Sequence, residues 1–99
     1  MTPQPIAGSN ERRLPTARSG IAAAVLRGRM LVFGGEAPAG TFNQAEAYDA
    51  RSNGWSTHAR MPTARHGLGA AAVAGRIYVI SGGPTPGASA SAANEIFAP

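Results

Sequence analysis

The chain has 99 residues, of which 43% are hydrophobic and 14% are charged, a balance that favours a small folded domain over general disorder. It contains no cysteine, which excludes disulfide bonds, and its two histidines, His58 and His66, could form a structural zinc site only with several scattered carboxylates. We therefore expect no metal and no cofactor. A domain this short buries a thin core, so extra burial is expected from oligomerisation or from a longer parent chain.

The net charge is +4, and all nine basic residues are arginines. Apart from Arg12-Arg13 and the pair Arg27 and Arg29, they are dispersed, whereas binding to nucleic acid calls for clustered cations. The longest uninterrupted apolar run, Ile21–Leu26, is too short for a signal peptide or a membrane span. The sequence thus predicts neither a nucleic-acid partner nor a membrane partner. Its localisation stays unknown, with the cytoplasm as the default if the chain is complete.

The predicted elements begin after an N-terminal segment, residues 1–13, which is expected to be disordered or to supply an extra strand. Ser19–Leu26 is an apolar run of small residues without polar alternation, which predicts a strand buried on both faces. Arg27-Gly28 predicts a tight turn, because glycine accepts the positive φ of two-residue hairpins. Arg29–Phe33 is then the returning strand.

Gly34-Gly35 ends this hairpin at a place where a Cβ atom or a negative φ is not tolerated. A long loop, Glu36–Asn43, leads to a third strand that carries Tyr48. Asp49–Gly54 is predicted as a polar turn and Trp55–His58 as a fourth short strand. No window has a helical period, since glycine and proline interrupt the alanine-rich runs.

The same order of elements recurs in the second half of the chain. A shift of 47 residues aligns Leu14–Phe33 with Met61–Ile80, and ten of the twenty aligned positions are identical. The second copy then has Gly82-Gly83, a loop at Pro84–Ala93 and a strand that carries Phe97. The chain is therefore built from two units of about fifty residues.

The order of hairpin, glycine pair, tyrosine, tryptophan and the segment Met61–Arg65 resembles the kelch repeat, in which four strands form one blade of a β-propeller. The resemblance covers Leu14–Pro99. It implies an all-β fold with two four-stranded antiparallel blades, residues 14–60 and residues 61–99, of which the second is incomplete because it lacks its fourth strand. The residues of the structural motif are Arg18, Gly34, Gly35, Tyr48, Trp55, Arg65, Gly82, Gly83 and Phe97.

The motif residues are expected to build the core rather than to bind a ligand. The three aromatic residues among them should pack between blades, since a propeller stacks its sheets face to face. The two arginines recur at equivalent positions, so we expect them to tie blade to blade through backbone carbonyls or through a carboxylate such as Glu46 or Glu95.

Two blades do not close a ring, because propellers use roughly four to eight. Further blades of the same propeller are therefore the first partner that the sequence predicts. Either copies of the chain assemble, about three copies giving about six blades, or the chain is the end of a longer propeller. The N-terminal segment takes the place of a fourth strand before the first blade, although Gly8 stands where Trp55 aligns.

The loops after the second and fourth strands of a blade emerge on one propeller face, because antiparallel strands alternate in direction. These loops are Glu36–Asn43, Ala59–Arg65 and Pro84–Ala93, and loops on a rigid scaffold are the usual place of recognition. The candidate binding residues on this face are Glu36, Thr41, Asn43, Arg60, Thr63, His66 and Thr85.

The resemblance implies a binding or assembly module that contacts a protein, or a glycan, through these loops, and no enzyme. One alternative is a fragment of a larger propeller enzyme that resembles galactose oxidase or a sialic-acid epimerase. The copper site of the former relies on a tyrosine crosslinked to cysteine, which this chain lacks, while Glu36 or Arg65 could serve the latter. Another alternative is a truncated segment without a function of its own.

Overall fold

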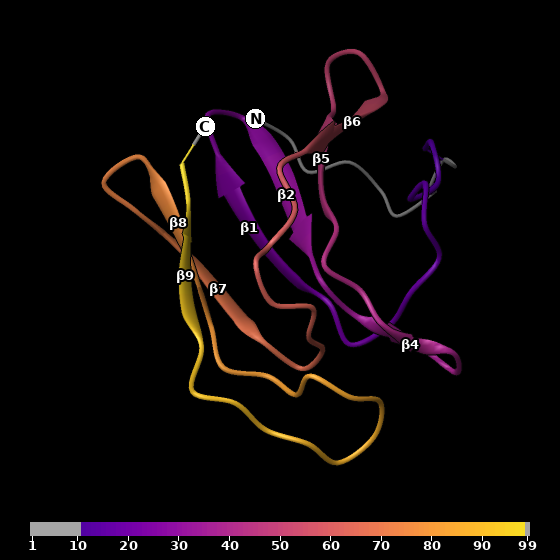
Figure 1. Cartoon of the computed structure of the whole chain (residues 1–99). Coiled ribbons are helices and arrows are strands. Elements are labelled where there is room, and N and C mark those ends of the chain that lie inside the picture. The colour runs from indigo at the N-terminus through magenta and orange to yellow at the C-terminus, as the bar shows by residue number, and fades with distance from the viewer. Residues whose placement is uncertain (1–10, 99) are drawn as a thin grey trace, which may run out of the picture.

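The computed structural model describes residues 11–98, and within that range the chain forms β-strands and no helix (Figure 1). The N-terminal segment predicted for residues 1–13, with Gly8, therefore lies largely outside the described residues. The strands are β1 (Ala22–Leu26), β2 (Arg29–Phe33), β3 (Glu36–Ala37), β4 (Gly40–Thr41), β5 (Ala45–Asp49), β6 (Gly54–His58), β7 (Gly69–Val73), β8 (Arg76–Ile80) and β9 (Asn94–Phe97).

Blade 1 is the antiparallel sheet β1-β2-β5-β6. Its first hairpin turns at Arg27 and Gly28, whose φ angles are 52° and 75°. Two consecutive positive φ angles give the turn whose twist matches that of the flanking strands. Ala74 and Gly75 repeat it with φ angles of 50° and 77°, so the predicted repeat holds at the level of backbone conformation.

Blade 2 is the antiparallel sheet β7-β8-β9. Its last strand, β9, is an edge strand, and no fourth strand pairs with it among residues 11–98. The prediction of an all-β chain with one four-stranded sheet and one incomplete sheet is therefore confirmed.

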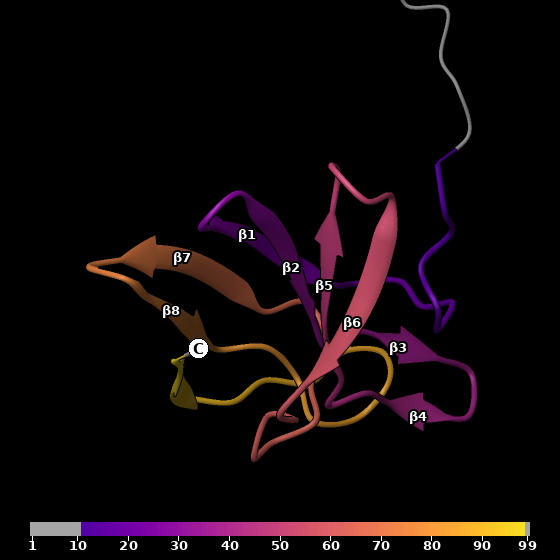
Figure 2. The same cartoon turned by 90° about the horizontal axis from the view of Figure 1, so that it is seen from above.

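The loop predicted at Glu36–Asn43 contains a short hairpin that the sequence did not indicate. β3 and β4 pair antiparallel, with Glu36 opposite Thr41 and Ala37 opposite Gly40. Pro38 and Ala39 are left to make the reversal. In Figure 2 this hairpin projects from one end of blade 1, beyond the edge of the four-stranded sheet.

The prediction that Ser19–Leu26 is one strand is wrong at its start, and its predicted burial on both faces is seen on one face of the described residues. The strand begins at Ala22, because Gly20 takes a φ of 66° and Ser19 instead forms an isolated bridge with Glu36. Only one face is covered: Ala22 is 7% exposed, whereas Val25, on the opposite face, is 65% exposed. That second face has no sheet against it among the described residues.

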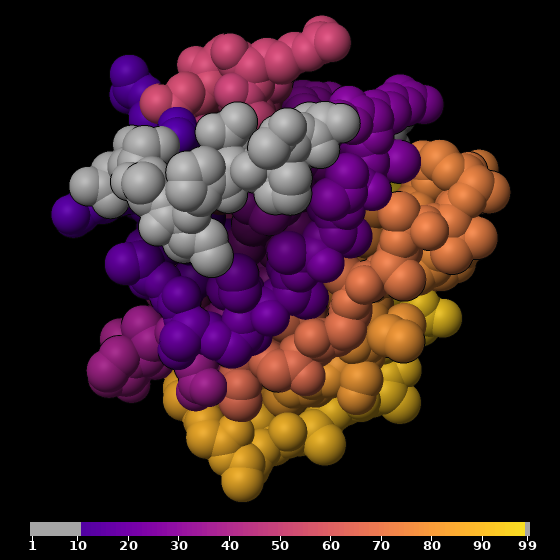
Figure 3. Space-filling view, turned by 180° about the vertical axis from the view of Figure 1, so that it is seen from behind, coloured from indigo at the N-terminus to yellow at the C-terminus, as the bar shows by residue number. Residues whose placement is uncertain are grey.

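The core lies between the two blades, where one face of each sheet packs on the other (Figure 2). In Figure 3 the orange residues of blade 2 lie directly against the violet residues of blade 1. Leu31 and Phe33 of β2 lie on the inner face of blade 1, and Ile77 and Val79 of β8 on the inner face of blade 2, all 3% exposed or less. The first strands, β1 and β7, lie close to one another, as the inner strands of neighbouring blades do. Burial between sheets thus supplies the main stabilisation.

Of the three motif aromatics, only Phe97 lies between the two described blades, where its ring meets Phe33 edge to face at 5.7 Å. Tyr48 and Trp55 do not lie between these two blades: they pair across β5 and β6 on the opposite face of blade 1, with ring centroids 5.1 Å apart, so their predicted packing against another blade stays a prediction. Side chains alternate along a strand, so Ala47 faces blade 2 and its neighbour Tyr48 faces away. The Trp55 Nε1–H donates a hydrogen bond to the carbonyl of Arg12 at 2.9 Å.

Candidate functional site

Each blade carries one arginine–glutamate pair at the same place. In blade 1 the Arg18 guanidinium contacts Glu46 at 2.6 Å, and in blade 2 the Arg65 guanidinium contacts Glu95 at 2.8 Å. Both arginine side chains are 0% exposed. Charge-assisted hydrogen bonds of this length are stronger than hydrogen bonds between neutral groups. Because these pairs are buried, their role is structural.

Arg65 links the two blades. Its backbone N–H donates to the carbonyl of Phe42 at 3.2 Å, and its carbonyl accepts from the Gly35 N–H at 2.9 Å, so its main chain joins blade 1. Its guanidinium donates to the carbonyls of Ser81 and Val79 in blade 2. The Nε atom of Arg65 has no hydrogen-bond partner among the described residues.

This arrangement lowers the pKa of the Glu95 carboxyl. Burial acts to raise the pKa of Glu95, but hydrogen bonds from the Thr63 hydroxyl and from Arg65 outweigh burial and hold the pKa below its ordinary value of 4.5. Thr63 donates to the second carboxylate oxygen at 2.7 Å. Thr63, predicted as a residue of the binding face, is therefore half-buried and bonded to Glu95 of blade 2.

The two glycine pairs let these backbones approach. Gly34 has a φ of 66°, and a Cβ atom there would overlap the carbonyl oxygen of Arg65. At Gly82, whose φ is 89°, a Cβ atom would lie 2.6 Å from the carbonyl oxygen of His66. Such distances are not found between real side chains and backbone, so both positions require glycine.

The loop face forms around His66, which connects the loops of the two blades. The Nδ1 atom of His66 lies 3.0 Å from the Glu36 carboxylate, at the start of β3, and its Nε2 atom lies 2.8 Å from the carbonyl of Thr85. Both partners are hydrogen-bond acceptors. The second Glu36 oxygen accepts the Gly87 N–H at 3.1 Å.

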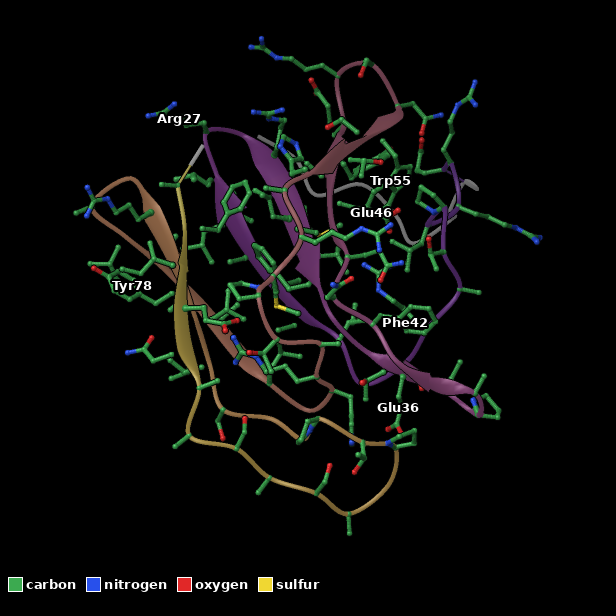
Figure 4. All side chains as sticks on the ribbon, in the orientation of Figure 1. Arg27, Glu36, Phe42, Glu46, Trp55 and Tyr78 are labelled. Carbon is green, nitrogen blue, oxygen red and sulfur yellow. The ribbon has the colours of Figure 1, made fainter. Side chains whose placement is uncertain are left out.

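A second contact fastens the same two loops. The Thr41 hydroxyl, on β4, donates to the carbonyl of Pro84 at 2.8 Å. In blade 2 the Ser89 hydroxyl donates to the Thr85 carbonyl at 2.6 Å and closes the loop on itself. Figure 4 shows Glu36 at the end of the molecule opposite to Arg27, where the loop of blade 2 passes it.

The seven candidate face residues thus separate into three groups. Glu36, Thr41, His66 and Thr85 come together, and we call these four residues the loop clamp. Asn43 and Arg60 form a separate pair, joined by a 3.5 Å hydrogen bond, while Thr63 bonds to Glu95. Sequence reasoning named the loop Pro84–Ala93 but did not single out Pro84, Gly87 and Ser89. Pro84 and Gly87 act through backbone groups, and the Ser89 hydroxyl bonds within the loop, so no residue spacing signals them.

Two hollows lie away from the loop clamp. A cavity of about 250 Å³ opens beside β9 and is lined mainly by apolar residues, among them Phe33, Met61, Val79 and Phe97. A polar hollow of about 270 Å³ at the opposite end of blade 1 is lined by Arg27, Gly28, Arg29, Asp49 and Arg51.

Two chemical features are missing from the part of the chain that the structure describes. No group of three or more His, Asp and Glu residues within residues 11–98 is placed to hold a metal ion. The same residues contain no helix with the length and apolar content needed to cross a membrane.

Two packed antiparallel sheets with their first strands adjacent, related by a sequence repeat, are consecutive blades of a β-propeller. The sequence profile of the kelch motif matches residues 17–62, so the chain contains a kelch motif and has the fold of part of a kelch propeller. No curated protein matches the sequence.

Among solved structures, that of YjhT, a kelch propeller protein, is similar to this chain. The TM-score is 0.68 and the sequence identity is 23%. The match covers 76% of this chain and 24% of YjhT, so this chain spans about a quarter of that protein. At this identity the likeness establishes the fold.

Proposed function

We propose that the chain is a binding module that contacts a protein partner through the loop face held by the loop clamp. The observation that carries this proposal is the His66 bridge, whose two ring nitrogens contact Glu36 of blade 1 and Thr85 of blade 2. It joins loops from separate blades into one surface. Loops that are fixed before binding lose less conformational freedom when a partner docks, which favours recognition.

The chemistry of the loops supports a protein partner. Pro84–Ala93 is built from proline, glycine, serine, threonine and alanine, so it offers shape and backbone groups rather than reactive side chains. Small ligands prefer concave apolar pockets, and the apolar cavity beside β9 is lined by Arg60 and by none of the four loop-clamp residues. An extended surface of this kind fits a macromolecule better than a small substrate.

The engagement of the charged residues supports binding over catalysis. Arg65 is buried, and its guanidinium contacts Ser81, Val79 and Glu95, which leaves it no access to a substrate. Both Glu36 oxygens are occupied, one by His66 and the other by the Gly87 N–H. A general acid or base needs a free position beside the reacting atom.

The test compares two variants that add the same charge at opposite ends of the molecule. Thr85→Arg changes an exposed side chain on the loop face, and Ser52→Arg changes an exposed side chain in the turn between β5 and β6. Each variant and the wild type are immobilised, and proteins captured from an extract of the source cells are quantified by mass spectrometry. We expect Thr85→Arg to lose a partner that the wild type and Ser52→Arg retain.

Equal capture by all three chains contradicts the proposal. The same three chains on a glycan array separate the protein partner from a carbohydrate one, since glycan binding that is lost only in Thr85→Arg assigns the face to sugar recognition. Turnover of a bound sugar contradicts the non-enzymatic role.

A further inference from the structure

Within residues 11–98, five of the six exposed large apolar residues lie on the two sheet faces that point away from the core, and the sixth is Ile21, just before β1. Val25 and Met30, on the outer face of blade 1, are 65% and 41% exposed. Val73, Ile80 and Ile96, on the outer face of blade 2, are 55%, 47% and 52% exposed. Exposed apolar residues that share a sheet face are typical of a contact with another macromolecule.

The outer face of blade 2 is equivalent, by the sequence repeat, to the inner face of blade 1, which blade 2 covers. The shift of 47 residues places Tyr78 and Ile80 on Leu31 and Phe33. Leu31 and Phe33 are 3% and 1% exposed because blade 2 packs on them. Figure 4 shows Tyr78 on the side of β8 that points away from blade 1.

The outer face of blade 1 is equivalent, by the sequence repeat, to the inner face of blade 2, which packs on blade 1. Met30 aligns with Ile77, which is 0% exposed in that contact. Tyr48 aligns with Phe97, whose ring packs on Phe33. The arginine–glutamate pair recurs as well, since Arg18 with Glu46 repeats Arg65 with Glu95.

We infer that a second copy of this chain docks head to tail, with the outer face of its blade 1 on the outer face of blade 2. The chain carries both halves of a contact that it already makes once internally, and the two halves lie on different blades. Such an interface is heterologous, so each added copy presents the same free face again. With roughly four to eight blades in a closed ring, about two to four copies complete it.

Few charged residues lie on the two faces of this contact: Glu46 and, beside Tyr48, Glu11 on blade 1, and Arg76 opposite Val73 on blade 2. On the outer face of blade 1, Glu46 is 4% exposed and already neutralised by Arg18. The apolar residues Val25 and Met30 are left to meet the second copy. This contact involves the sheet faces and not the loop clamp, so it is independent of the proposed recognition surface.

The experiment uses the full chain, with light scattering on a sizing column and circular dichroism of the same peak. The wild type is expected to elute as a folded oligomer of defined mass rather than at 10.0 kDa. Met30→Arg disables the blade 1 face and Ile80→Arg disables the blade 2 face. Each variant alone is expected to be a folded monomer, because both positions are exposed. Arg51→Ser, in the turn between β5 and β6, is the control that keeps the oligomer.

A mixture of the two variants decides the mode of association. Met30→Arg retains an intact blade 2 face and Ile80→Arg retains an intact blade 1 face, so the mixture is expected to form a 1:1 dimer of about twice the monomer mass that grows no further. A mixture that stays monomeric overturns the head-to-tail contact. If the wild type is a folded monomer or is unfolded, a second copy does not cover these faces, and they are assigned to further blades of a longer chain. Thr85→Arg, which tests the loop face, is expected to keep the oligomer.

Discussion

The Gly35 N–H donates a 2.9 Å hydrogen bond to the carbonyl of Arg65, and the same arginine sends its guanidinium to the opposite side. There it meets Glu95 at 2.8 Å. One residue therefore belongs to blade 1 through its backbone and to blade 2 through its side chain. The stability of the contact between blades depends on this arrangement.

Replacing Arg65 by methionine is expected to lower the free energy of unfolding by about 3 kcal/mol, because Glu95 is left as a largely buried charge without its partner. Urea denaturation measures this loss. Arg29→Met is the matched control, since Arg29 is half-buried at the surface and a change of about 0.5 kcal/mol or less is expected there. The double variant Arg65→Met, Glu95→Gln should recover part of the loss. Equal effects at both arginines contradict the structural role of Arg65.

Stability is expected to fall in acid through Glu95. Its pKa is lower in the folded chain than the ordinary value of 4.5, so its contribution is fully present above that value and is lost as the pH falls through the lower folded pKa. Thermal unfolding from pH 7 to pH 3 measures this for the wild type and for Glu95→Gln. The stability gap between them should be largest near neutral pH and shrink in acid. A gap that is constant over the range contradicts the prediction.

Gly34→Ala is expected to lower the free energy of unfolding by more than the unfavourable φ angle of alanine alone would. Gly34 and Gly28 both have positive φ angles, 66° and 75°, but only at Gly34 would a Cβ atom meet backbone, namely the Arg65 carbonyl. Gly28→Ala should lower the free energy of unfolding by about 1 kcal/mol, the cost of a left-handed alanine. A clearly larger loss at Gly34, measured by urea denaturation, separates steric overlap from φ strain. Equal losses contradict the close approach of the two backbones.

Glu36→Ala is expected to loosen the loop of blade 2 while leaving the global fold intact. It removes the acceptor of the Gly87 N–H and one partner of His66. Hydrogen exchange followed by NMR should show faster exchange at the Gly87 amide. Asp49→Ala, which removes the acceptor of the Arg51 N–H at the opposite end, should speed exchange at Arg51 and leave Gly87 unchanged. Unchanged exchange at Gly87 in Glu36→Ala contradicts the clamp.

The fold was predictable because each hairpin repeats at a fixed shift with its turn glycine, as Gly28 and Gly75 do. Hydrophobic pattern and turn chemistry agree there, so the strands follow from local signals. The sheet face on which each side chain lies was harder to predict from the sequence. A run such as Ala45–Asp49 alternates, but the pairing of Tyr48 with Met30 decides which set faces blade 2, and that register is a tertiary property.

The loop clamp was predicted only in part. The positions of Glu36, Thr41, His66 and Thr85 on one face follow from strand direction, yet their mutual contacts depend on how two blades are rotated against each other. The β3–β4 hairpin adds to this, because it sets where Glu36 and Thr41 lie. Nothing in the order of residues specifies that rotation.

The arginine–glutamate pair is completed inside a single repeat. Arg18 and Glu46 are 0% and 5% exposed at their side chains, although no earlier blade stands beside them among the described residues. Each unit of about fifty residues thus brings its own counter-charge into the interior. Duplicating or deleting a whole unit leaves no buried charge uncompensated, so the number of blades can change by gene duplication without any compensating substitution at this pair.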